Sequence, residues 1–98
     1  MKMKIGIMGV GFVGGTTAKV LEREHEIFLY DRYKAPNNTS ESIETLAKYA
    51  EVVFICVPTP MKPSGEIDYS PMHHSLKLLA DTAKKVERYP SEILVTVT

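Results

Sequence analysis

The strongest constraint on the fold is a glycine-rich turn that directly follows a short apolar run. Residues 4–8, KIGIM, are typical of a short buried strand, and Gly9, Gly11 and Gly14 follow in the pattern G-x-G-x-x-G. At a strand-to-helix junction this pattern predicts dinucleotide binding. Gly9 permits the tight turn, Gly11 lets a pyrophosphate approach the backbone, and Gly14 lets the next helix pack closely on the sheet. The N-terminus of that helix offers N–H groups and a positive dipole end to the phosphates.

An acidic residue at the end of the next apolar run strengthens this interpretation. Asp31 lies 22 residues after Gly9, at the end of the run HEIFLYD. A carboxylate at this place accepts hydrogen bonds from an adenosine ribose, as NAD binding requires. Arg32 follows directly and could stack on adenine or attract a 2′-phosphate, but the carboxylate favours NAD over NADP as the cofactor. The alternative is a tight turn with an unrelated acid downstream.

Composition narrows the class of protein and of partner. With 98 residues the chain is one small domain, and its 12 basic and 12 acidic side chains cancel. No basic excess points to nucleic acid or to an anionic membrane surface. The single cysteine, Cys56, excludes an internal disulfide framework and fits a reducing compartment. Because no signal peptide and no membrane-spanning run is found, a cytoplasmic location is expected.

Hydrophobic periodicity predicts four strands that alternate with three helices. The predicted strands are residues 3–8, 25–31, 51–57 and 93–97, and the predicted helices are 12–23, 41–49 and 71–88. This order predicts an α/β fold, namely a Rossmann-like open parallel sheet of about four strands with helices on both faces. Pro90 is expected to end the third helix, and Ser70 to cap its start with Pro71 at the first helical position.

The first two helices carry more detailed expectations. The buried side chains expected on the first helix are Val13, Thr17, Val20 and Leu21. Thr39 or Ser40 is expected to cap the second helix.

Three separate segments are expected to meet at one edge of the sheet. Ligands of open parallel sheets bind beyond the carboxyl ends of the strands, where the strand order changes direction. Residues 9–14, Asp31 and residues 57–60 all lie at the carboxyl ends of predicted strands. The sequence therefore predicts a single ligand crevice formed by these segments.

Several of these segments resemble one known family. Residues 4–14, Asp31, the run FICVPTP at residues 54–60, and then Gly65 and Asp68 are similar to the N-terminal NAD-binding domain of UDP-glucose/GDP-mannose dehydrogenases. The similarity spans nearly the whole chain, and VPTP followed by a loop with Gly and Asp is its most specific part. Members of the family oxidise the C6 alcohol of a nucleotide sugar to a carboxylate in two NAD-dependent steps.

This resemblance implies a set of cofactor contacts and a nucleotide-sugar substrate for the full-length enzyme. The implied NAD-binding residues are Gly9, Gly11, Phe12, Val13, Gly14, Asp31, Arg32, Val57, Pro58 and Thr59. The glycines would approach the pyrophosphate, Asp31 would bind the ribose, and Val57 to Thr59 would border the nicotinamide.

The chain departs from the family in two ways. The connection from Asp31 to the third predicted strand is much shorter than usual, so the sheet is expected to run 2-1-3-4 with its switch point between the first and third strands. The chain is also expected to end before the family's catalytic half, so the nucleophilic cysteine, the lysine and the asparagine of the active site have no counterparts. Cys56 is not that nucleophile, because it lies in a predicted buried strand. We therefore expect residues 1–98 to be the NAD-binding part of a longer enzyme, inactive alone.

Two other functions fit the same motifs. A free-standing nucleotide-binding module with a regulatory role would explain the compact connection at residues 32–40. A dehydrogenase of the 6-phosphogluconate or β-hydroxyacid type shares the glycine pattern, although VPTP at residues 57–60 argues against it.

Three further features receive structural interpretations. His73 and His74 are neighbours on a predicted helix, so their side chains diverge by about 100° and a solvated pair is favoured over a metal site. Asp68 is as well suited to capping the third helix as to binding a ligand. Residues 61–64 are expected to form a mobile loop beside the crevice.

Overall fold

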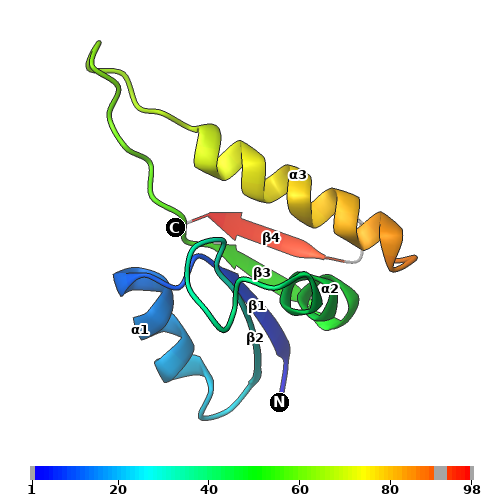
Figure 1. Ribbon diagram of the computed structural model, residues 1–98. Coiled ribbons are helices and arrows are strands. Elements are labelled where there is room, and N and C mark those ends of the chain that lie inside the picture. Colours follow the sequence, from blue (N-terminus) through cyan, green and yellow to red (C-terminus); the bar gives the residue numbers. More distant parts are fainter. Residues whose placement is uncertain (1, 90–92, 98) are drawn as a thin grey trace.

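The computed structural model describes residues 2–89 and 93–97 and confirms the predicted architecture. The strands are β1 (Lys4–Met8), β2 (Glu26–Tyr30), β3 (Val52–Ile55) and β4 (Leu94–Val97), and the helices are α1 (Phe12–Leu21), α2 (Ser40–Tyr49) and α3 (Ser70–Lys85). The four strands form one parallel sheet in the order β2-β1-β3-β4, as expected (Figure 1). The strand order therefore changes direction between β1 and β3.

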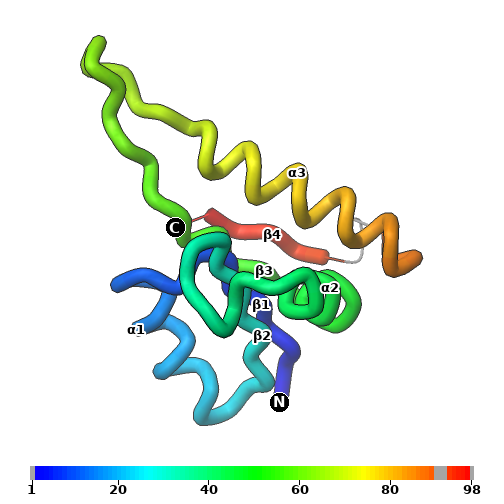
Figure 2. Tube along the Cα trace, viewed as in Figure 1, coloured from blue at the N-terminus to red at the C-terminus, as the bar shows by residue number. Residues whose placement is uncertain are grey.

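Helices cover both faces of this sheet. Helix α1 lies on one face, whereas α2 and α3 lie beside each other on the other face (Figures 1 and 2). This arrangement follows from right-handed crossovers, because the chain moves in one direction from β1 to β2 and in the opposite direction from β2 to β3 and β4. The α1 crossover and the two later crossovers therefore end on opposite faces.

Two apolar clusters correspond to the two faces. Alternate residues of β1 supply both, since Ile5 and Ile7 pack towards α1 while Met8 packs towards α2 and α3. The larger cluster on the α2/α3 face contains the fully buried Leu46, Val53 and Ile55, among other residues. The central strands β1 and β3 are thus covered on both faces, as their near-continuous apolar sequences predict.

The predicted buried face of α1 is wrong, because two of its four residues are exposed and the other two, Thr17 and Leu21, are only half-buried. Val13 and Val20 are 54% and 64% exposed, and the buried residues of α1 are Gly14 and Ala18. Helix α1 lies so close to the sheet that only small side chains fit between them. Residues with no bulk, rather than the largest apolar ones, therefore mark the face that contacts the sheet.

Several predicted boundaries also need correction. Strand β1 begins at Lys4 and β2 at Glu26, β3 ends at Ile55, and α1 and α3 end earlier than predicted, at Leu21 and Lys85. Helix α2 begins at Ser40, one residue earlier than predicted. Thr39, one of the two predicted caps, is its N-cap, and the Thr39 hydroxyl accepts a hydrogen bond from the Ser42 N–H at 3.1 Å. Pro90, the expected stop after α3, lies outside the described residues.

The start of α3 differs from the prediction. Tyr69 is the N-cap, Ser70 is the first helical residue, and Pro71 is the second. The Ser70 N–H instead donates to Asp68 Oδ1 at 2.9 Å, so a carboxylate two residues earlier holds this end of the helix. The expectation that Asp68 helps to cap the helix is confirmed in this form.

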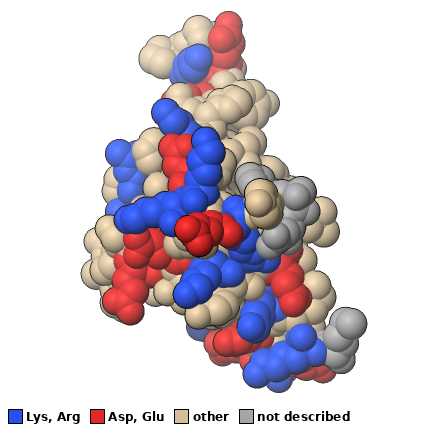
Figure 3. Space-filling view, turned by 90° about the vertical axis from the view of Figure 1, so that its right-hand side faces the viewer, with Lys and Arg blue, Asp and Glu red and all other residues tan. Residues whose placement is uncertain are grey.

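Charged side chains show no concentration of one sign on the face drawn in Figure 3. Lys and Arg alternate there with Asp and Glu, in agreement with the balanced composition. One ion pair joins the two helices of the larger layer, between Lys85 of α3 and Glu44 of α2 at 2.6 Å. No helix in the described part of the chain is both long and apolar enough to cross a membrane.

Candidate functional site at the carboxyl edge of the sheet

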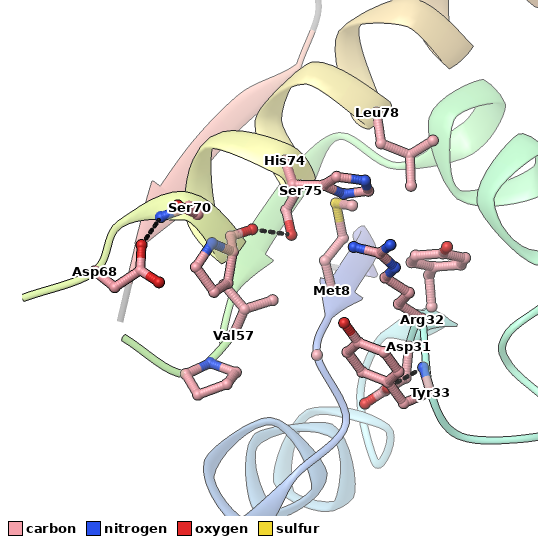
Figure 4. Close-up of a pocket in the computed structure, with 14 residues that line it drawn as sticks. Met8, Asp31, Arg32, Tyr33, Val57, Asp68, Ser70, His74, Ser75 and Leu78 are labelled. Atoms are coloured by element: carbon pink, nitrogen blue, oxygen red, sulfur yellow. Dashed lines mark hydrogen bonds between the residues drawn. The ribbon is translucent and has the colours of Figure 1, made fainter. Parts of the chain in front are cut away.

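A cavity of about 420 Å³ opens at the carboxyl edge of the sheet, on the side that faces α3. It lies beyond the ends of β1, β2 and β3, where the strand order changes direction. Its lining residues are Met8, Gly9, Tyr30, Asp31, Arg32, Tyr33, Val57, Pro58, Asp68, Ser70, Pro71, His74, Ser75 and Leu78. Figure 4 shows the loop after β2 on one side, and Val57 and Asp68 opposite, with His74, Ser75 and Leu78 of α3 above.

The glycine turn after β1 is fixed by its contact with β3. Gly9 has φ of +97°, a conformation that L side chains rarely adopt, and a Cβ atom there would lie 2.8 Å from the carbonyl carbon of Cys56. The Gly9 N–H donates to the Tyr30 carbonyl oxygen at 2.8 Å, so the ladder with β2 continues into the turn. Gly9 is therefore required by the fold itself.

Gly14 and Gly11 play different parts in the same turn. A Cβ atom on Gly14 would overlap the Gly9 carbonyl oxygen, so Gly14 lets α1 pack against the turn. A Cβ atom on Gly11 would meet no protein atom within 4 Å. Gly11 has φ of −89° and ψ of −150°, so neither backbone strain nor packing requires glycine at this position. The absence of a side chain at Gly11 leaves open space at the start of α1.

The N-terminus of α1 has few polar neighbours of its own. Gly11 is the N-cap and supplies no side-chain hydrogen bond, and no acidic residue lies in the first turn. The first two residues, Phe12 and Val13, are 92% and 54% exposed. The positive end of the helix dipole therefore faces open surface, an arrangement that suits an anionic group.

Asp31 connects the glycine turn to the loop after β2. Its side chain is only 8% exposed, and its two carboxylate oxygens accept hydrogen bonds from the backbone N–H groups of Val10 and Tyr33, at 2.7 and 2.9 Å. A carboxylate oxygen has two acceptor positions, so each oxygen retains one for a hydroxyl group. Asp31 can thus hold the turn and a ribose at the same time.

Two cationic side chains follow Asp31 on the same loop. Lys34 Nζ donates to the Val10 carbonyl oxygen at 3.1 Å, so Asp31 and Lys34 bind opposite ends of one residue. The Arg32 guanidinium carbon lies 5.4 Å from the centre of the Tyr33 ring. In Figure 4 the Arg32 side chain points into the cavity towards α3.

Helix α3 supplies the opposite wall with polar groups near its start. Ser75 is 8% exposed, and its hydroxyl donates to the Pro71 carbonyl oxygen at 2.9 Å. Hydrogen bonds from the Ser70 hydroxyl and backbone N–H lower the pKa of Asp68 from its ordinary value, so this carboxyl group is ionised at neutral pH. His74 also lines the cavity, while His73 does not.

The cavity contains half of the residues that the sequence predicted for cofactor binding. The predicted residues that line it are Gly9, Asp31, Arg32, Val57 and Pro58. Those that lie outside its lining are Gly11, Phe12, Val13, Gly14 and Thr59. The first four of these form the start of α1, directly after Gly9, so they border the same edge of the sheet.

Sequence reasoning missed the contribution of α3. His74, Ser75 and Leu78 were not predicted as site residues, although they line the cavity. One signal could have found them: α3 follows the strand that ends at the switch point, so its first two turns must pass over that edge.

The segment predicted as a mobile loop is a short hairpin. Met61 and Ile67 form an antiparallel bridge, and the Lys62 N–H donates to the Glu66 carbonyl oxygen at 2.6 Å. Gly65 has φ of +90° at the turn, and its N–H donates to the Lys62 carbonyl oxygen at 2.9 Å. The hairpin extends away from the sheet between β3 and α3 (Figure 2).

Cys56 lies one residue beyond β3 rather than within the strand as predicted, and it is half-buried. It packs on the α1 face, where a Cβ atom on Gly14 would lie 3.3 Å from the Cys56 Cβ atom. Cys56 therefore lies on the α1 side of the glycine turn, outside the cavity lining. Within residues 2–89 and 93–97, no group of three or more His, Cys, Asp or Glu side chains could hold a metal ion.

Comparison with known proteins adds a similarity of fold. No protein-family model and no curated protein matches the chain. The structure is similar to a ternary complex of GDP-mannose dehydrogenase from Pseudomonas aeruginosa, with a TM-score of 0.66 and 23% sequence identity. The match covers 98% of this chain and 28% of that chain, so the protein spans less than a third of the length of the dehydrogenase. At this level of identity the match establishes a shared fold.

Proposed function

We propose that residues 1–98 form the NAD-binding domain of an oxidoreductase that acts on a nucleotide sugar. The observation that carries the proposal is the open space at Gly11. Backbone strain and packing explain Gly9 and Gly14, but neither explains Gly11, whose side-chain position meets no protein atom within 4 Å. An absent side chain beside an uncapped helix N-terminus is what close approach of a pyrophosphate requires.

The residues at this edge of the sheet are suited to the pyrophosphate, the adenosine ribose and the nicotinamide of NAD. Gly11, Phe12 and Val13 would hold the pyrophosphate through the start of α1, and Asp31 would hold the adenosine ribose through its remaining acceptor positions. Val57, Pro58 and Thr59 would border the nicotinamide, beyond the end of β3. When bound, NAD accepts a hydride from an alcohol, and the protein provides its binding and orientation.

The nucleotide-sugar substrate is proposed from sequence and fold together. The segment VPTP at residues 57–60, followed by Gly65 and Asp68, resembles the family that oxidises nucleotide sugars, and a GDP-mannose dehydrogenase shares the fold. Oxidation through a covalent intermediate needs an accessible thiolate next to the substrate. Because Cys56 lies behind the glycine turn, we propose that other parts of a longer protein supply the catalytic groups.

A calorimetric titration of the 98-residue protein with NADH, and then with UDP-glucose, tests the cofactor assignment. We expect saturable NADH binding and no response to UDP-glucose. The decisive variant is Gly11→Val, which should remain folded and lose NADH binding because the valine side chain occupies the space at the start of α1.

Gly15→Val is the matched control. A Cβ atom on Gly15 also meets no protein atom within 4 Å, but Gly15 lies four residues, or about 6 Å, further along α1. This variant should bind NADH as the unmodified protein does. Unchanged NADH affinity in folded Gly11→Val would contradict the proposed function.

A further inference from the structure

The loop after β2 carries more positive charge than binding of an unphosphorylated ribose requires. Residues 31–37 contain Arg32 and Lys34 and a single acid, Asp31, so two positive charges and one negative charge leave the loop with a net charge of +1. We infer that this loop also holds a 2′-phosphate on the ribose, so that the site accepts NADPH as well as NADH. The inference rests on the proposed function and extends its cofactor class.

The first step concerns the charge of Asp31. A carboxylate at this position ordinarily excludes NADPH by repelling the 2′-phosphate. Here both carboxylate oxygens accept backbone N–H groups, at 2.7 and 2.9 Å, and the side chain is 8% exposed. Two N–H dipoles that point at the carboxylate offset part of its negative potential towards the surface.

The second step concerns Lys34. Its ammonium group lies 3.1 Å from the Val10 carbonyl oxygen, and the N–H group of the same residue holds Asp31. Lys34 therefore lies beside the place where Asp31 would bind the ribose. Its only hydrogen bond among the described residues is to a neutral carbonyl oxygen, and it forms no ion pair with any acid in that part of the chain.

The third step concerns Arg32 and the shape of the loop. Its guanidinium group points into the cavity and forms no ion pair among the described residues (Figure 4). The loop closes on itself, because the Asp31 N–H donates to the Asn37 carbonyl oxygen and the Asn37 N–H donates to the Lys34 carbonyl oxygen, both at 3.0 Å. One hydrogen-bonded loop thus carries both cations, with Arg32 in the cavity lining and Lys34 beside it at the glycine turn.

The fourth step concerns other negative charge at the cavity. Besides Asp31, the only acid among the described residues that line it is Asp68, which lies at the start of α3 on the opposite wall. Asp68 accepts the Ser70 N–H at 2.9 Å, so it too has a donor on its carboxylate. A phosphate monoester adds about 1.5 to 2 negative charges at neutral pH, which Arg32 and Lys34 together can balance.

Titrations of NADH and NADPH against the 98-residue protein at matched ionic strength test the inference. The dissociation constant for NADPH should lie within about tenfold of that for NADH, that is, within about 1.4 kcal/mol. In Lys34→Met, NADPH affinity should fall by about tenfold relative to NADH affinity, because a charge-assisted hydrogen bond to phosphate is lost. NADPH binding should also weaken more steeply than NADH binding as salt is added.

Lys19→Met is the control for the loss of one positive charge. Lys19 is exposed in the last turn of α1, at the end of the helix remote from the cavity, so its removal should change both affinities equally. A Kd for NADPH more than about tenfold weaker than that for NADH would overturn the inference while leaving the proposed function intact. Equal losses of NADH and NADPH affinity in Lys34→Met would do the same. Failure of both nucleotides to bind would contradict the proposed function itself.

Discussion

Gly14 is the position at which one added methyl group should cost the most. In Gly14→Ala the new Cβ atom would overlap the Gly9 carbonyl oxygen, lie 3.0 Å from the Gly9 carbonyl carbon, and lie 3.3 Å from the Cys56 Cβ atom. The first two are backbone atoms of a turn that β3 already confines, so α1 must move away from the sheet. Overpacking of this kind costs about 3 kcal/mol, while the better helix propensity of alanine returns about 1 kcal/mol.

We therefore expect Gly14→Ala to lose about 2 kcal/mol of unfolding free energy. Gly15→Ala is the matched control, because its Cβ atom meets no protein atom within 4 Å and it should gain about 1 kcal/mol from propensity alone. Urea denaturation followed by far-UV circular dichroism measures both values. A difference of less than about 1 kcal/mol between the two variants would refute the close packing of α1 on the turn.

Two other side chains of the site give predictions of a different kind. Asp31→Ala should lower the unfolding free energy by about 2 kcal/mol, because the Val10 and Tyr33 N–H groups lose their acceptor, and it should weaken NADH binding more than NADPH binding. Equal losses of the two nucleotides in a titration would show that Asp31 does not touch the ribose. The pKa of Asp68 should lie below its ordinary value of 3.8, so its stabilising contribution is complete above that pH and is lost as the pH falls through the folded-state pKa. An NMR titration should show this pKa rising in Ser70→Ala, and an unchanged value would exclude the Ser70 hydroxyl as the main cause.

The sequence contained enough information to predict the strand order. Four apolar runs separated by helical patterns require a parallel sheet, and the short connection at residues 32–39 leaves room for one crossover only. The packing face of α1 could not be predicted in the same way. Hydrophobic periodicity gives most weight to large side chains such as Val13 and Val20, whereas the distance from helix to sheet is set by Gly14 and Ala18.

The candidate site could be predicted only where it follows strand ends. Gly9, Asp31 and Val57 line the cavity because parallel strands finish at the same edge, which the sequence order already implies. The α3 wall was missed because His74 and Ser75 are polar, and a polar residue in a helical pattern is ordinarily assigned to the solvent face. Ser75 is nevertheless buried, since its hydroxyl donates to the Pro71 carbonyl oxygen within the helix.

The cavity and its chemistry have separate origins. The cavity arises because α1 and α3 lie on opposite faces of the sheet, so a crevice remains beyond the ends of β1 and β3, with α3 as one of its walls. Any sequence with this strand order would leave such a crevice. Under the proposed function, the nucleotide that enters it is selected by features that the fold does not require, namely the absent side chain at Gly11 and the cations Arg32 and Lys34. Substitution of these residues should therefore change nucleotide affinity with little change in stability. Substitution of Gly9 or Gly14 should instead lower the stability of the fold before it affects nucleotide affinity.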